Sequence, residues 1–150
     1  MPLMNAIAVE ASITIGDFSS RELSNLAWAF ARCSVSKLKL MDSIAEQAIT
    51  KISGFRPQEV ANLAWAFARQ AVRNKPLIDS ISKKAVLNIA EFKAPDIAGL
   101  AWSFAAMGLR DAPLFGAISN QALPMIQEFE ATDLASIAWS VAKLGYGNQP

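Results

Sequence analysis

A tryptophan recurs every 37 residues along this chain, at Trp28, Trp65, Trp102 and Trp139. Each lies in a copy of one octapeptide, which reads Asn-Leu-Ala-Trp-Ala-Phe-Ala-Arg in the first two copies and varies in the last two. A fixed period of 20 to 50 residues is typical of solenoids, in which each unit buries its apolar face against its neighbours. The spacing therefore predicts a repeat array rather than one globular core.

The first half of each repeat predicts an amphipathic helix, which we call the A helix. Its apolar residues follow the i, i+3, i+4, i+7, i+8 spacing of one buried face, as in Leu23, Leu26, Ala27, Phe30 and Ala31. An acid lies near each expected start, where it suits the helix dipole: Glu22, Glu59, Asp96 and Asp133. We expect the A helices at 20–32, 57–69, 94–107 and 131–143.

The second half of each repeat predicts a B helix with apolar residues four positions apart. The strip comprises Leu40, Ile44, Ala48 and Ile52, and it recurs one and two periods later and one period earlier. Pro76 and Pro113 lie at the starts of two B helices, where a missing N–H costs little. Pro124 lies inside the third full B helix and is expected to kink or shorten it.

Together these patterns predict an all-α, right-handed α-solenoid of 37-residue helical hairpins. A half repeat comes first, three full A–B pairs follow, and the chain closes on an A helix that we expect to reach Tyr146 to Pro150. Neither end has the polar capping repeat that solenoids normally need, so we expect a segment of a longer array or ends covered by a partner; the alternative is a short, open-ended array. The expected repeats lie near 1–17 (partial), 18–54, 55–91, 92–128 and 129–150.

Composition argues against several functions. The chain has no histidine and a single cysteine, Cys33, so we expect no catalytic site, metal site, disulfide or cofactor. The longest weakly polar run, Ile97 to Leu109, is too short to span a bilayer. Residues 1–16 contain no Arg or Lys, so they do not have the pattern of a targeting peptide. The net charge of +1 gives no global basic footprint for nucleic acid.

The Leu-Ala-Trp-Ala-Phe-Ala signature on paired helices resembles the octotricopeptide and heptatricopeptide repeat family. It is also similar to the repeat regions of FAST-kinase-like and RAP-domain proteins. The resemblance covers essentially the whole chain; the period fits the heptatricopeptide variant better, and these 150 residues do not include a RAP domain. It implies binding of single-stranded RNA and a role in organellar RNA processing, stability or translation, within a ribonucleoprotein complex. The implied compartment is the mitochondrion, with the plastid as the alternative.

Polar positions on the uncovered side of the A helices are the candidate RNA-binding residues. Amide and hydroxyl groups can hydrogen-bond base edges, and cations can hold phosphates. The candidates are Asn25, Arg32, Asn62, Arg69, Ser103, Ser136, Ser140 and Lys143. We expect the repeated tryptophans to lie mainly in the packed core rather than to contact a ligand.

A protein-interaction scaffold without RNA binding is the alternative function. Helical solenoids also use their concave faces to bind peptides, and the near-zero net charge favours this reading. An enzyme is disfavoured because the acids recur at one capping position in every copy. The sequence therefore predicts a binding protein, with RNA as the first partner and protein as the second.

Overall fold

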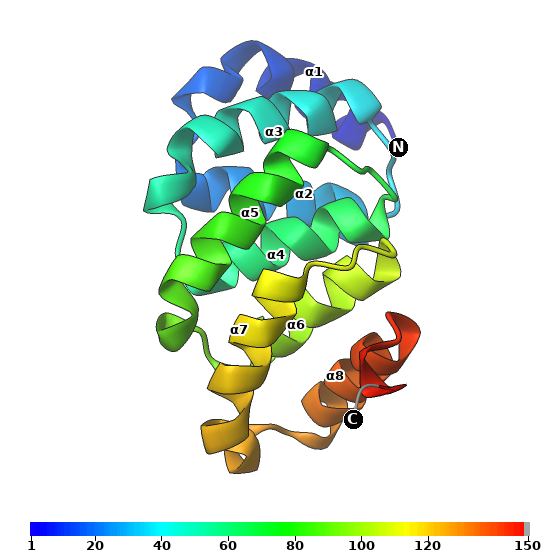
Figure 1. The fold of residues 1–150 in the computed structure, drawn as a ribbon. Coiled ribbons are helices and arrows are strands. Elements are labelled where there is room, and N and C mark those ends of the chain that lie inside the picture. The colour runs from blue at the N-terminus through cyan, green and yellow to red at the C-terminus, as the bar shows by residue number, and fades with distance from the viewer. Residues whose placement is uncertain (149–150) are drawn as a thin grey trace.

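The computed structural model describes residues 1–148, which form eight α-helices and short 3-10 turns without strands. The helices stack as consecutive hairpins from α1 to α8 (Figure 1). This confirms the all-helical solenoid. The A helices are α2 (Ser20–Arg32), α4 (Pro57–Arg69), α6 (Ala94–Ala106) and α8 (Ala131–Lys143), and the B helices are α1 (Pro2–Thr14), α3 (Leu38–Lys51), α5 (Lys75–Asn88) and α7 (Ala112–Ala122).

The A helices begin and end where the sequence predicts, except that α6 stops one residue early. After α8, residues Tyr146–Asn148 form a 3-10 turn, so the expectation of an A helix beyond Tyr146 is wrong for these residues. Positions 149–150 lie outside the described residues. None of the helices in residues 1–148 has the length and apolar character needed to cross a membrane.

Small residues hold the A helices together. Ala27, Ala64 and Ala101 are at most 1% exposed, and a short side chain allows the closest approach of two helices. Neighbouring A helices contact each other far more extensively than neighbouring B helices do. The A helices therefore form the more tightly packed of the two rows.

In α2, α4 and α6 the buried anchor is a phenylalanine and not the tryptophan two residues before it. Phe30, Phe67 and Phe104 are each 1% exposed, whereas Trp28 is 42% and Trp139 is 44% exposed. The other two tryptophans are half-buried. The expectation that the tryptophans lie in the core is therefore wrong for the outer two. At 100° per residue, the phenylalanine lies in the middle of the apolar arc and the tryptophan lies at its border.

A residue with positive φ lies two positions after the end of each A helix. The φ values are 55° at Ser34 and Ala71, 69° at Gly108 and 75° at Gly145. In the first hairpin the N–H of Val35 donates to the Phe30 carbonyl at 3.0 Å, which is the pattern of a Schellman C-cap. After α2, α4 and α6 this left-handed turn directs the chain into the following B helix.

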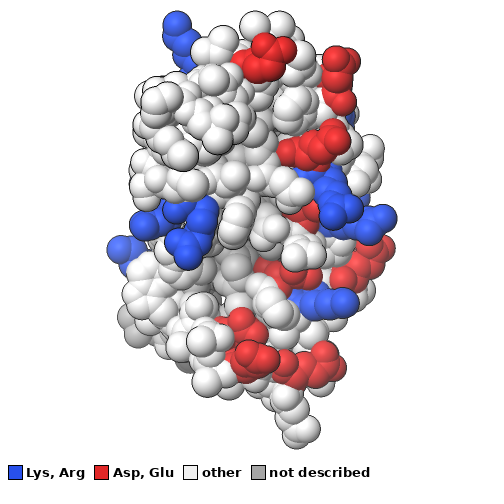
Figure 2. Space-filling view, turned by 180° about the vertical axis from the view of Figure 1, so that it is seen from behind, with Lys and Arg blue, Asp and Glu red and all other residues white. Residues whose placement is uncertain are grey.

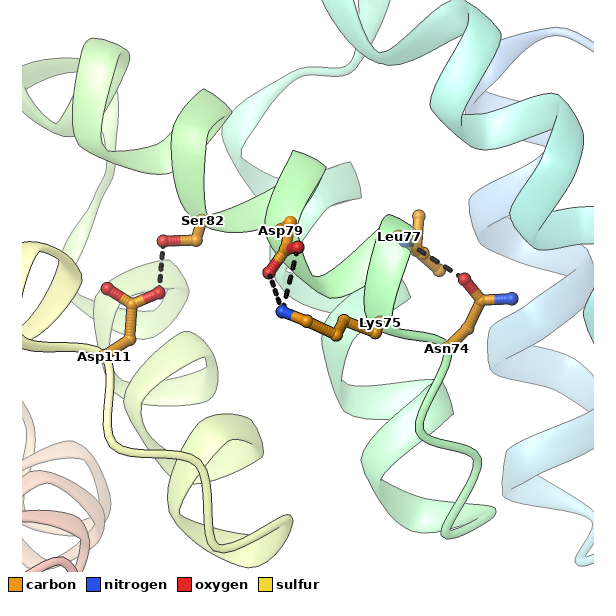
Figure 3. Close-up of polar contacts among 6 residues, drawn as sticks. All are labelled: Asn74, Lys75, Leu77, Asp79, Ser82 and Asp111. Carbon is orange, nitrogen blue, oxygen red and sulfur yellow. Dashed lines mark hydrogen bonds and ion pairs between the residues drawn. The ribbon is translucent and has the colours of Figure 1, made fainter.

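Polar side chains fix the starts of two B helices and join them (Figure 3). Asn74 accepts the Leu77 N–H at 3.1 Å, and Asp111 accepts the Leu114 N–H at 2.9 Å. The second carboxylate oxygen of Asp111 accepts the Ser82 hydroxyl at 2.5 Å. One aspartate therefore caps α7 and ties it to α5.

Pro124 ends the third full B helix, as the sequence predicts. Helix α7 stops at Ala122, and the 3-10 segment Leu123–Glu128 follows, with non-helical φ and ψ at Met125. Helices α3 and α5 are 14 residues long, but α7 has only 11. The proline removes a backbone donor and its ring clashes with the preceding turn, so the helix cannot continue through it unbroken.

Positions that are buried in the inner repeats are exposed in the first and last helices. Leu3 in α1 is 60% exposed, whereas Leu40, one period later, is 2% exposed. Leu134 in α8 is 41% exposed, whereas Ile97, one period earlier, is fully buried. Whether these surfaces are covered by further repeats or by a partner remains a prediction.

Replacing Phe67 by Ala should lower the free energy of unfolding by about 3–5 kcal/mol, because it removes a fully buried ring. Replacing Trp28 by Ala should cost clearly less, because that ring is already partly in water. Urea unfolding followed by circular dichroism measures both changes. Equal losses would contradict the assignment of the phenylalanine as the anchor.

Replacing Ala71 by Gly should stabilise the protein. Relief of the left-handed conformation is worth about 1–2 kcal/mol, and the greater freedom of glycine in the unfolded chain cancels about 0.4–1 kcal/mol of it. The matched change, Gly108→Ala, should destabilise, since its added Cβ meets no atom closer than 3.9 Å and only the backbone is strained. Thermal melts of both variants show whether each change raises or lowers stability. A destabilised Ala71→Gly variant would refute the prediction.

Candidate functional site

Each A helix carries one row of three positions on its outer side, and the middle position is a tryptophan. Asn25, Trp28 and Arg32 follow the spacing i, i+3, i+7 in α2, and all three are exposed. We call the equivalent positions of all four A helices the A face. Its members are Asn25, Trp28, Arg32, Asn62, Trp65, Arg69, Gly99, Trp102, Ala106, Ser136, Trp139 and Lys143.

Asn25 and Asn62 lie together. They line a recess of about 360 Å³ between α2 and α4, which also contains Arg21, Arg56, Gln58 and Glu59. Sequence reasoning missed both arginines and Gln58. Arg21 and Gln58 each lie four residues before the asparagine of their helix, so helical spacing places them on the same face. Position 56 precedes its helix, and no periodic signal marks it.

The tryptophans of neighbouring A helices form ring pairs. The centroids of Trp28 and Trp65 are 6.4 Å apart, and those of Trp102 and Trp139 are 6.5 Å apart. Packed helices usually have axes about 8–10 Å apart, so the rings lean toward each other across the helix boundary. The Lys143 ammonium lies 5.7 Å from the Trp139 ring centroid, within the range of a cation–π contact.

The charges of the A helices separate along the helix axes. Acids occupy the first turn of all four A helices, and Arg32, Arg69 and Lys143 occupy the last turn of three of them. All three cations are exposed. Figure 2 shows red side chains along one side of the molecule with blue side chains among them, and a separate group of blue side chains on the opposite side. Uncharged surface, shown white, lies between them.

Ser103 and Ser140 do not reach this surface, so their assignment as contact residues is corrected. Both are fully buried. The Ser103 hydroxyl donates to the Gly99 carbonyl at 2.7 Å, and the Ser140 hydroxyl donates to the Ser136 carbonyl at 2.6 Å. Their position in the repeat corresponds to the fully buried Ala66 and packs inside the array. Ser136 itself is half-buried on the A face.

The acids at the helix starts act as caps. The Glu22 carboxylate accepts the Ser19 N–H at 2.8 Å, while the Ser19 hydroxyl accepts the Glu22 N–H at 3.2 Å. These hydrogen bonds lower the pKa of Glu22. Asp96 also caps its helix, but burial raises its pKa more than the bond from the Lys93 N–H lowers it. Glu22 and Asp96 at the helix starts therefore serve to cap their helices.

The two carboxylates should affect stability with opposite dependence on pH. Because the Glu22 pKa is lowered on folding, the charged carboxylate stabilises the folded protein. This stabilisation is present above the unfolded pKa and is lost as pH falls through the folded pKa. Because the Asp96 pKa is raised on folding, the folded protein favours the neutral carboxyl. This stabilisation is fully present below the unfolded pKa and is lost as pH rises through the folded pKa.

Between pH 3 and pH 7, the wild type should therefore gain stability relative to Glu22→Gln and lose stability relative to Asp96→Asn. Urea midpoints across this range measure both differences. The same slope for both variants would contradict the prediction.

Comparison with known proteins gives one family. No curated protein sequence matches the chain. A family model described as RNA-editing substrate-binding complex 6 protein matches residues 5–149, nearly the whole chain and every A helix of the stack. The chain therefore belongs to the RNA-editing substrate-binding complex 6 protein family.

Proposed function

We propose that this protein binds single-stranded RNA on the A face and acts, without catalysis of its own, in organellar RNA processing, stability or translation. One observation carries the proposal: amide, aromatic and cationic side chains share one row in α2 and in α4, and a tryptophan occupies this row in all four A helices. In α2 and α4 the row is complete, with Asn25, Arg32, Asn62 and Arg69. Membership of a family of RNA-editing complex proteins supports RNA as the partner.

The side chains of this row can contact different parts of an RNA strand. Arg32, Arg69 and Lys143 offer exposed cations at the ends of their helices, where they can neutralise phosphates. The amides of Asn25 and Asn62 open into the recess between α2 and α4, where they can hydrogen-bond base edges. Ser136 offers a hydroxyl at the equivalent position of α8. Phosphate contacts supply affinity, and the variable amide position supplies preference among bases.

The proposed compartment is the mitochondrion, with the plastid as the alternative. Its support is the family of RNA-editing complex proteins and the resemblance of the tryptophan-centred signature to octotricopeptide and heptatricopeptide repeats. The same family supports protein partners in a ribonucleoprotein complex.

A protein-binding role has its own support on the opposite row of helices. Val9, Ile13 and Leu38 are 64%, 73% and 63% exposed. They line a mostly apolar recess of about 750 Å³ between α1 and α3. This surface suits an apolar protein partner better than a polyanion. The B helices are therefore the second candidate interface.

Changing both Arg32 and Arg69 to Ala should weaken binding of single-stranded RNA and make it less sensitive to salt. Each lost phosphate contact should reduce the slope of log K against log salt by about 0.7. Fluorescence anisotropy of a labelled single-stranded RNA, titrated at several salt concentrations, measures both quantities.

The matched control is the pair Lys39→Ala and Lys83→Ala, which removes the same charge from exposed positions on the B helices. It should leave the slope unchanged. Equal effects of the two double variants would show binding by net charge alone. Absence of binding by the folded wild type at low salt would refute the proposed function.

A further inference from the structure

The function proposed above assigns parts of the RNA to the amides and cations of the A face but none to its tryptophans, which are its most regular feature. Trp28 is 42% exposed and Trp139 is 44% exposed, although the fold already has a buried phenylalanine in three of the four A helices. Leaving so much of an indole in water forfeits apolar burial, worth roughly 25 cal/mol per Å². In α4 and α6, which have A helices on both sides, Trp65 and Trp102 are still only half-buried, although Trp65 also packs against the core. Part of the indole therefore remains at the surface in every repeat.

The rings form a discontinuous aromatic surface across the whole array. Trp28 and Trp65 bridge α2 and α4, while Trp102 and Trp139 bridge α6 and α8. The interplanar angles are 34° and 27°, so the two rings of each pair present similarly oriented faces. The surface therefore runs across the helices, in the direction in which the repeats follow one another.

Cations and amides flank these rings within the same rows. In α2 and α4 an asparagine lies three residues before each tryptophan and an arginine lies four residues after it. In α8 the Lys143 ammonium lies 5.7 Å from the Trp139 ring. A positive edge beside an aromatic surface complements a single-stranded nucleic acid, which has anionic phosphates on one side and flat apolar bases on the other.

We propose that the four tryptophans form a stacking platform on which bases of single-stranded RNA lie, with the phosphates toward Arg32, Arg69 and Lys143. This inference rests on the proposed function and adds the group that the site recognises. Base–aromatic stacking accepts every base, because every base has a π face. The tryptophans therefore supply affinity without sequence preference, and the asparagines of the same rows discriminate among bases.

The test compares substitutions that change the ring with substitutions that change the charge. Trp28→Leu and Trp139→Leu keep an apolar side chain but remove the flat surface, and each affects a different ring pair. Each should weaken binding of a labelled oligouridylate by about 5- to 150-fold, the range expected for losing one stacked base. The slope of affinity against salt should not change, because no phosphate contact is lost.

Matched controls separate stacking from folding. Trp28→Phe keeps an aromatic face and should retain most of the affinity. Leu87→Ala, at a side chain that is 81% exposed on α5, should have no effect on binding. Circular dichroism and thermal melts confirm that each variant is folded. If Trp28→Leu and Trp139→Leu unfold the protein, the wild type alone still decides the question with the RNA probes described next.

An abasic version of the same oligouridylate retains the phosphates but has nothing to stack. The wild-type protein should bind it at least about fivefold more weakly. Its tryptophan fluorescence should be quenched by the intact oligomer and not by the abasic one. Equal affinity for the two RNAs with no quenching would overturn the stacking platform while leaving RNA binding intact. No binding of either RNA at low salt would overturn both proposals and favour a protein partner for the A face.

Discussion

Close packing of alanines between neighbouring A helices is the contact on which the rest of the structure depends. Ala27, Ala64 and Ala101 are almost completely buried, and they let the A helices approach each other more closely than the B helices do. This packing brings groups from separate repeats together, such as the Trp28 and Trp65 rings at 6.4 Å.

The sequence predicted the helices well, because their periodicity, caps and breakers are all local. Helix starts followed from acids and prolines in the first turn, and Pro124 marked the shortened α7. The tryptophans were misplaced for a physical reason. A residue that never varies among the repeats of one chain can be fixed either by the core or by the surface, and repetition alone does not separate the two. Trp28 lies at the border of the apolar arc, where a helical wheel does not determine whether a residue is buried or exposed.

The candidate site was predicted only in part. The spacing within one helix shows which residues share a face, but the shape of the site depends on how neighbouring helices pack. Asn25 and Arg32 are exposed on one row, as expected. Ser103 and Ser140 are not, because the tight A row buries the position they occupy. The recess shared by Asn25 and Asn62 depends on how two helices lie side by side, which no single repeat specifies.

The requirements of folding also set the electrostatics of the A face. Acids near helix starts accept free backbone N–H groups, and cations near helix ends offset the partial negative charge of free carbonyls. All four A helices run in the same direction, so their starts line up along one edge and their ends along another. The first edge carries the acids together with Arg21, Arg56 and Lys93, and the second carries Arg32, Arg69 and Lys143. In the proposed complex the phosphates lie at the second edge, because its cations have no acid in the same helical turn. The bases then lie toward the tryptophans.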